Sequence, residues 1–153
     1  MSSSPEPSQP LSTTTLLGPA LLGLDPGSAK CGLAVVGVDR SLHYHEVVNV
    51  AQVKQTIQSL REAYPISGIV MGDQTGSKQW RSQLEALPDP PRITLVDERY
   101  SSLEARDRYW QMYPPKGLGK LVPQSLRSIP RPIDDIVAIL LIERYLKRLS
   151  GKD

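Results

Sequence analysis

The chain has 153 residues, of which 39% are hydrophobic and 22% are charged, a composition typical of one soluble globular domain. Its single cysteine, Cys31, excludes an intramolecular disulfide and a multi-cysteine zinc site. No apolar run approaches the roughly 20 residues of a membrane-spanning helix, and we see no secretion signal. We therefore expect a cytoplasmic protein that does not associate with membranes. The net charge of +2 alone indicates no class of partner.

Residues 1–18 are rich in Ser, Thr and Pro, which predicts a disordered tail, and residues 19–150 are predicted to form a single domain. Three apolar or alternating runs, 20–25, 32–38 and 42–50, are separated by turn residues and predict an antiparallel meander. His43 and His45 lie two apart on the third strand, hence on one face. No acidic partner is evident for them, so we expect both to face solvent rather than bind a metal.

The middle of the chain alternates helices and strands. Apolar residues at helical spacing predict a helix over 53–64, which Pro65 ends. The apolar run 68–72 is typical of a strand covered on both faces. A second helix carrying Trp80, Leu84 and Leu87 follows, and then a strand over 93–96. Because a strand–helix–strand connection is right-handed, the fourth strand should run parallel to the first. We expect a mixed five-stranded α/β sheet in the order 3-2-1-4-5, with helices on both faces.

The last third of the chain is predicted to contain two helices. Ser101 and Glu104 have the spacing of a capping box, which would open a helix reaching about Tyr113. Residues 114–130 have no clear period and predict a mobile basic loop. The final helix begins near Ile133 and is apolar almost all round, so we expect it to pack into the core. Tyr109 and Trp110 are interpreted as core residues, with stacking on an unpaired base as the alternative.

Three carboxylates stand at the ends of predicted elements: Asp25 after the first strand, Glu98 between the fifth strand and a helix, and Asp134 in the first turn of the last helix. Asp25 can instead cap its turn, and Asp134 can serve as an N-cap. If the three converge, their mutual repulsion requires cations. A site of oxygen donors alone suits Mg²⁺ or Mn²⁺. Two such ions could activate a water and stabilise the leaving oxygen in phosphodiester hydrolysis.

Convergence is the demanding step of this hypothesis. In the sheet order above, Asp25 and Glu98 lie two strand spacings apart, about 10 Å, so Glu98 would have to reach back along the edge of the sheet. Asp73 follows the adjacent strand and is a reserve ligand. Asp135, next to Asp134, is left open as a further one.

Basic residues are concentrated in one part of the chain, with seven of them against two acidic residues between Arg99 and Arg131. This pattern indicates contact with phosphate or nucleic acid, or else a solvated surface. Lys30 and Arg99 closely follow two of the carboxylates, and Lys78 lies near a predicted helix N-terminus, where phosphates bind. The predicted nucleic-acid-binding residues are Lys30, Lys78, Arg99, Lys116, Lys120, Arg127 and Arg131.

Three blocks of sequence resemble a known family. They are DPGSAKCGLA at residues 25–34, VDERYSSLEA at 96–105 and IDDIVAILLIERYL at 133–146. In this order and spacing they resemble the YqgF (RuvX) family of RNase H-like nucleases, which is related to the RuvC Holliday-junction resolvases, and the chain looks like a cyanobacterial branch. Departures occur at Asp73-Gln74, where the family has a hydrophobic residue and Pro, and at Val137, where Ala is usual.

The resemblance implies an RNase H-like fold and a divalent-metal nuclease that uses Mg²⁺ or Mn²⁺. It implies Asp25, Glu98 and Asp134 as both catalytic residues and metal ligands. The implied role is maturation of the precursor of 16S ribosomal RNA, with resolution of Holliday junctions or other branched DNA as the alternative, in which case a homodimer would cut two strands.

Two other classes of protein remain open. An ATP-dependent phosphotransferase of the actin and sugar-kinase type shares this fold, but it needs two such domains and the chain has room for one. A non-catalytic nucleic-acid-binding module is the second, although the presence of all three carboxylates argues against it. The segment from Gly72 to Lys78 is one residue too short for a P-loop, which we reject.

Overall fold

The computed structural model describes residues 18–74 and 76–151, so the predicted tail, apart from Gly18, lies outside the described residues. One mixed sheet runs through the molecule in the order β3-β2-β1-β4-β5, as predicted. β1 pairs antiparallel with β2 and parallel with β4, β2 pairs antiparallel with β3, and β4 pairs parallel with β5. The strands are β1 (Ala20–Asp25), β2 (Lys30–Gly37), β3 (Leu42–Asn49), β4 (Ile66–Gly72) and β5 (Ile93–Val96).

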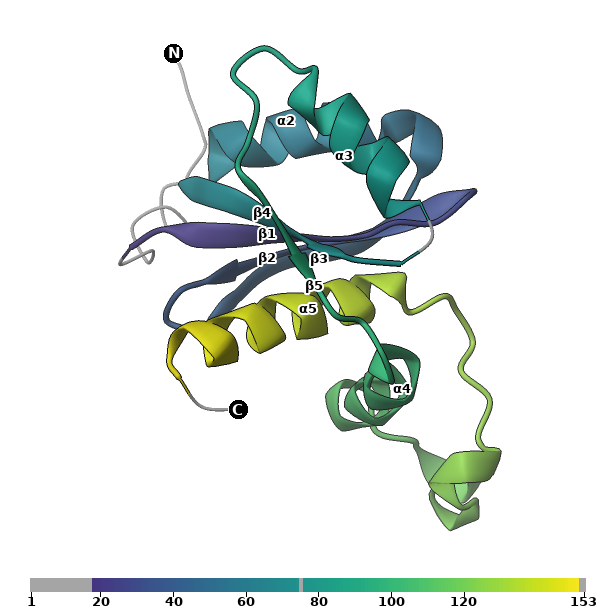
Figure 1. The fold of residues 1–153 in the computed structure, drawn as a ribbon. Coiled ribbons are helices and arrows are strands. Elements are labelled where there is room, and N and C mark those ends of the chain that lie inside the picture. The colour runs from purple at the N-terminus through teal and green to yellow at the C-terminus, as the bar shows by residue number, and fades with distance from the viewer. Residues whose placement is uncertain (1–17, 75, 152–153) are drawn as a thin grey trace, which may run out of the picture.

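Helices cover both faces of this sheet (Figure 1), which confirms the predicted layering. α2 (Val53–Ala63), preceded by the 3-10 turn η1 (Val50–Gln52), and α3 (Ser77–Glu85) lie on one face. α4 (Ser101–Met112) and α5 (Asp134–Leu149) lie on the other. None of the helices in the described part of the chain is both long enough and apolar enough to cross a membrane.

Each face has its own hydrophobic core. The core under α2 and α3 includes Leu22, Leu33, Ile57 and Leu84. The core on the opposite face is built around α5, in which every residue from 135 to 142 is buried. The sequence pattern of that helix, apolar on nearly all sides, is therefore explained by its position between the sheet and α4.

Two glycines let α5 lie directly against the central strands. A Cβ atom on Gly23 of β1 would meet the carbonyl oxygen of Ala138 at 2.5 Å, and one on Gly32 of β2 would collide with the carbonyl group of Asp134. Real Cβ contacts are never this close, so a side chain at either position would push the helix off the sheet. The beginning of α5 is thus held at one fixed height above β1 and β2.

The predicted capping box of α4 is wrong. The N-cap residue is Tyr100, in a left-handed conformation with φ of 63°, and it makes no side-chain capping bond. The Glu104 carboxylate instead pairs with Arg144 of α5 at 3.0 Å. The Glu104 side chain, which the local pattern assigned to the helix cap, is thus bound instead by a residue of α5 that is distant in sequence.

The segment between α4 and α5 has more structure than the loop that was predicted. It contains two 3-10 turns, η2 (Gly117–Leu121) and η3 (Gln124–Leu126), and lies beyond α4, away from the sheet (Figure 1). The Arg127 guanidinium packs 5.4 Å from the centre of the Trp110 ring. Tyr109 is 7% exposed and Trp110 packs against the core, so the interpretation of both as core residues is confirmed.

We expect Leu141→Ala to destabilise the chain by about 2–5 kcal/mol, because Leu141 is fully buried and the truncation leaves a cavity. Urea unfolding measures this loss. Leu149→Ala on the same helix is the matched control, since Leu149 is 64% exposed, and should change stability little. Equal effects of the two substitutions would contradict the packing described for α5.

Candidate active site

Asp25 and Asp134 meet where β1 ends and α5 begins. Asp25 is the last residue of β1 and pairs in register with Gly32 of β2. The close approach of Gly32 to the main chain of Asp134 sets the beginning of α5 against the end of β1, and the Asp134 carboxyl lies close enough to Asp25 to raise the pKa of Asp25 by its charge and by hydrogen bonding. Two acidic groups from opposite ends of the domain are therefore in direct contact.

The pKa of Asp25 is raised far above its ordinary value, first by burial and then by its acidic neighbours. Burial raises the pKa of Asp25 to about 8, with further contributions from the negative charges of Glu98 and Asp134 and from the hydrogen bond to Asp134. The pKa of Asp134 is also raised, mainly by burial and then by the charge of its neighbour Asp135. Like charges brought together in a poorly solvated site favour protonation in this way.

Glu98 approaches this pair across the end of β4. A Cβ atom on Gly72, the last residue of β4, would collide with the Glu98 carboxylate. The Glu98 side chain can therefore extend over the end of β4 only because residue 72 has no side chain. Burial raises the pKa of Glu98, and the charge of Asp73 raises it further, while Arg144 opposes both. The Oε1 atom of Glu98 is buried without a hydrogen-bond partner.

The donor chemistry at these three carboxylates fits a divalent cation. All the donors are oxygens, the Asp25 proton is one that a cation could displace, and the buried Oε1 of Glu98 has no protein partner. Within residues 18–74 and 76–151, however, no three or more His, Cys, Asp or Glu side chains stand in an arrangement that could hold a metal ion. Closing all three around one ion therefore requires a side-chain movement.

Asp135, which follows Asp134 in the sequence, has partners of its own. It is 2% exposed, its Oδ2 lies 2.7 Å from Nδ1 of His45, and its Oδ1 lies 3.0 Å from the Arg131 guanidinium. Both oxygens are engaged, which argues against Asp135 as a further metal ligand. The expectation that His45 faces solvent without a partner is wrong, because its partner lies 90 residues away in sequence.

The structure also bears on two further alternatives, for Asp134 and Asp73. Ile133 is the N-cap residue of α5, with no side-chain capping bond, so Asp134 is not an N-cap. Asp73 is exposed and its charge acts on Glu98, while it is absent from the groups that shift the pKa of Asp25.

A cavity of about 450 Å³ is lined by Lys30, His45, Tyr113, Arg131 and Asp135, and Asp25, Glu98 and Asp134 are not among its lining residues. The positive charge of Lys30 lowers the pKa of Asp134, which places the lysine near the carboxylate pair. Of the predicted nucleic-acid-binding residues, Lys30 and Arg131 thus line one cavity, and Lys30 is the one whose charge acts on the carboxylate pair.

The remaining predicted nucleic-acid-binding residues are spread more widely. Arg99 adjoins Glu98 and its guanidinium is paired with Asp97 at 2.9 Å. Lys78 is exposed in the first turn of α3. Lys116 and Lys120 are exposed on the segment between α4 and α5, whereas Arg127 is half-buried against Trp110.

Comparison with known proteins gives matches among solved structures only. No family model and no curated protein matches the chain. The structure of Thermus thermophilus RuvC in complex with a Holliday junction substrate matches with a TM-score of 0.56 and 18% identity, over 87% of this chain and 96% of that one. A second Thermus thermophilus RuvC structure matches with a TM-score of 0.49 and 14% identity, over 86% and 96%. The first of these matches, together with the strand order, shows that the chain has an RNase H-like α/β fold like that of RuvC.

We expect the stability of the metal-free chain to fall as the pH rises from about 5 to 8. Asp25 keeps its proton in the folded state up to a pKa of about 8, against an ordinary value of 3.8, so between these values the folded state binds more protons than the unfolded state. The loss should be on the order of 2–5 kcal/mol and much smaller in Asp25→Asn. Urea unfolding in the presence of a chelator measures it.

The matched control for this prediction is Asp89→Asn. The Asp89 side chain is 96% exposed, so this variant should retain the full pH dependence of the wild-type chain. An identical pH dependence in wild type and Asp25→Asn would contradict the assignment of the proton to Asp25.

Proposed function

We propose that this chain is a divalent-metal-dependent nuclease that hydrolyses phosphodiester bonds in structured nucleic acid. The observation that carries the proposal is the direct contact of Asp25 with Asp134, with the unpartnered Oε1 of Glu98 facing the same end of the sheet. A structural role does not account for this arrangement, because burying these acidic groups together and raising the pKa of Asp25 to about 8 opposes folding at neutral pH.

Each carboxylate has a distinct part in this proposal. Asp25, Glu98 and Asp134 would hold Mg²⁺ or Mn²⁺, and a bound pair of ions supplies an activated water and stabilises charge on the leaving oxygen. Asp25 gives up its proton when it becomes a ligand, since only the carboxylate form binds. Asp134 is fixed by the buried helix behind it, and Glu98 by the turn between β5 and α4.

The nucleic acid would approach the carboxylates beside the cavity that contains Lys30 and Arg131. Lys30 is exposed at the start of β2 and can contact a phosphate next to the one being cut. Arg131 is held by Asp135 and packs 5.6 Å from the centre of the Tyr109 ring, so its charge is presented from a rigid position. Arg99, Lys78, Lys116, Lys120 and Arg127 would extend the basic surface along the strand.

Two substrates follow from different observations. The match to RuvC, solved in complex with a Holliday junction substrate, supports branched DNA as the first substrate to test. The resemblance of the three sequence blocks to the YqgF family supports the precursor of 16S ribosomal RNA as the second. Cutting two strands of a branch takes two sites, so we propose that a cytoplasmic homodimer is the active form on DNA.

We expect cleavage of a labelled four-way DNA junction or of precursor ribosomal RNA in Mg²⁺ or Mn²⁺, and none with a chelator. Asp25→Asn, Glu98→Gln and Asp134→Asn should each reduce the cleavage rate more than about 100-fold, because even residues behind metal ligands contribute 10–100-fold. Binding of the same substrates should persist, and Asp89→Asn should cleave as wild type does. Binding without any cleavage would favour the non-catalytic module, and ATP hydrolysis would favour the kinase-like class.

We expect binding of nucleic acid to weaken steeply as salt is raised, since contacts to phosphate release counterions. Lys30→Gln should lower affinity and reduce the slope of log K against log salt by about 1. Lys54→Gln is the matched control, because Lys54 is exposed on α2, which covers the face of the sheet opposite to α4 and α5. If the affinity does not depend on salt, or if both variants change the slope equally, Lys30 does not contribute to the binding surface.

A further inference from the structure

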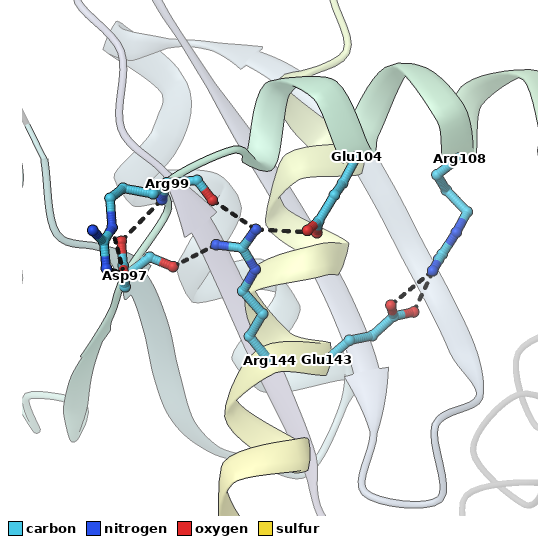
Figure 2. Close-up of polar contacts among 6 residues, drawn as sticks. All are labelled: Asp97, Arg99, Glu104, Arg108, Glu143 and Arg144. Atoms are coloured by element: carbon cyan, nitrogen blue, oxygen red, sulfur yellow. Dashed lines mark hydrogen bonds and ion pairs between the residues drawn. The ribbon is translucent and has the colours of Figure 1, made fainter. Parts of the chain in front are cut away.

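Arg144 of α5 binds the main chain on both sides of Glu98 (Figure 2). Its Nη1 donates to the carbonyl oxygen of Asp97 at 2.6 Å, and its Nη2 donates to the carbonyl oxygen of Arg99 at 2.8 Å. The same Nη2 lies 3.0 Å from the carboxylate of Glu104 in the first turn of α4. One guanidinium therefore spans the end of β5, the turn that carries Glu98, and the beginning of α4.

The turn held in this way has an unfavourable backbone conformation. Tyr100 has φ of 63°, a left-handed conformation that costs a non-glycine residue free energy and persists where the surroundings enforce it. The Asp97 side chain also stabilises the turn, because its carboxylate accepts a hydrogen bond of 2.9 Å from the backbone N–H of Arg99. Tyr100 itself is 74% exposed, so its side chain is not what enforces the conformation.

The geometry leaves the Glu98 carboxylate available. Both terminal nitrogens of Arg144 are used on carbonyl oxygens and on Glu104, and Oε1 of Glu98 remains buried without a hydrogen-bond partner. A basic residue that only neutralised the site would be expected to pair with Glu98 itself. Arg144 instead holds the peptide groups around Glu98.

We propose that Arg144 is a positioning residue that fixes the main chain around Glu98 and so aims its carboxylate across Gly72 toward Asp25. This inference rests on the proposed nuclease function for its catalytic consequence. It also means that α5 positions two of the three carboxylates: Asp134 through its first turn, and Glu98 through Arg144 near its other end.

The neighbouring residue on α5 offers a matched control. Glu143 accepts two hydrogen bonds from Arg108 of α4, at 2.9 and 2.8 Å (Figure 2). This pair also joins α5 to α4, but it does not touch the turn at residues 97–100. Glu143→Gln therefore removes the charge and the two-point pairing of an equivalent link between the same two helices without releasing Glu98. Glu104→Gln removes one partner of Arg144 and leaves both carbonyl contacts.

The experiment compares Arg144→Ala, Arg144→Lys, Glu104→Gln and Glu143→Gln in the full chain. Amide hydrogen exchange over residues 97–101 reports the turn, electron paramagnetic resonance of added Mn²⁺ reports metal affinity, and steady-state cleavage of the four-way junction separates kcat from KM. Arg144→Ala should speed exchange in the turn, lower Mn²⁺ affinity and lower kcat, the last two by roughly 10- to 100-fold, with KM nearly unchanged.

Lysine at position 144 keeps the charge but lacks the planar fork, so Arg144→Lys should resemble Arg144→Ala. Glu104→Gln should lie between these variants and wild type, and Glu143→Gln should match wild type in all three measurements. If Arg144→Ala does not fold, Arg144→Lys carries the test. The inference is overturned if the Arg144 variants match Glu143→Gln, or if their loss is in KM alone, which would indicate direct contact with the substrate.

Failure of the proposed function gives a different result. In that case the wild-type chain would neither bind Mn²⁺ nor cleave, while faster exchange at residues 97–101 in Arg144→Ala and not in Glu143→Gln would still identify Arg144 as the residue that fixes the turn.

Discussion

The close packing of α5 against β1 and β2 is the constraint on which the rest of the structure depends. It buries residues 135–142 of the helix between the sheet and α4. It also requires glycine at two positions of the sheet that face the helix, Gly23 and Gly32. The same packing brings Asp134 into contact with Asp25. Hydrophobic burial spread over a long helix thus holds together two acidic groups that would repel each other in isolation.

The fold could be predicted largely from the sequence because its signals are local. Alternating and fully apolar runs identified the five strands, helical spacing identified α2 and α3, a segment apolar on nearly all sides identified α5, and the crossover connection predicted that β4 runs parallel to β1. The errors share one cause. Glu104 and His45 were assigned from their near neighbours, yet their partners are Arg144 and Asp135, which reach them only in the folded chain.

The sequence was enough to select the three carboxylates as candidates, but it was not enough to predict how they lie relative to one another. Asp25, Glu98 and Asp134 were noticeable because each stands at the end of an element, but the route that takes Glu98 past β4 depends on Gly72. That signal was present in the sequence as a glycine at the end of a strand. The role of Arg144 had no such signal, since Lys147 and Arg148 on the same helix look equivalent until the carbonyl contacts are seen.

The order of the elements along the chain has a consequence for biosynthesis. Among the described elements, α5, which packs against β1 and β2, comes after all five strands and after the helices of the other face. During translation, β1, β2 and β4 can pair and be covered by α2 while their second face, with Leu21, Val36 and Val70, still lacks its helix. A nascent chain at that stage exposes an apolar surface that is prone to aggregation and that a chaperone could shield. It also lacks Asp134, so Asp25 does not yet have its acidic neighbour from α5. The cluster of Asp25 and Asp134 therefore forms only after α5 has been made, and all five strands of the sheet precede that helix.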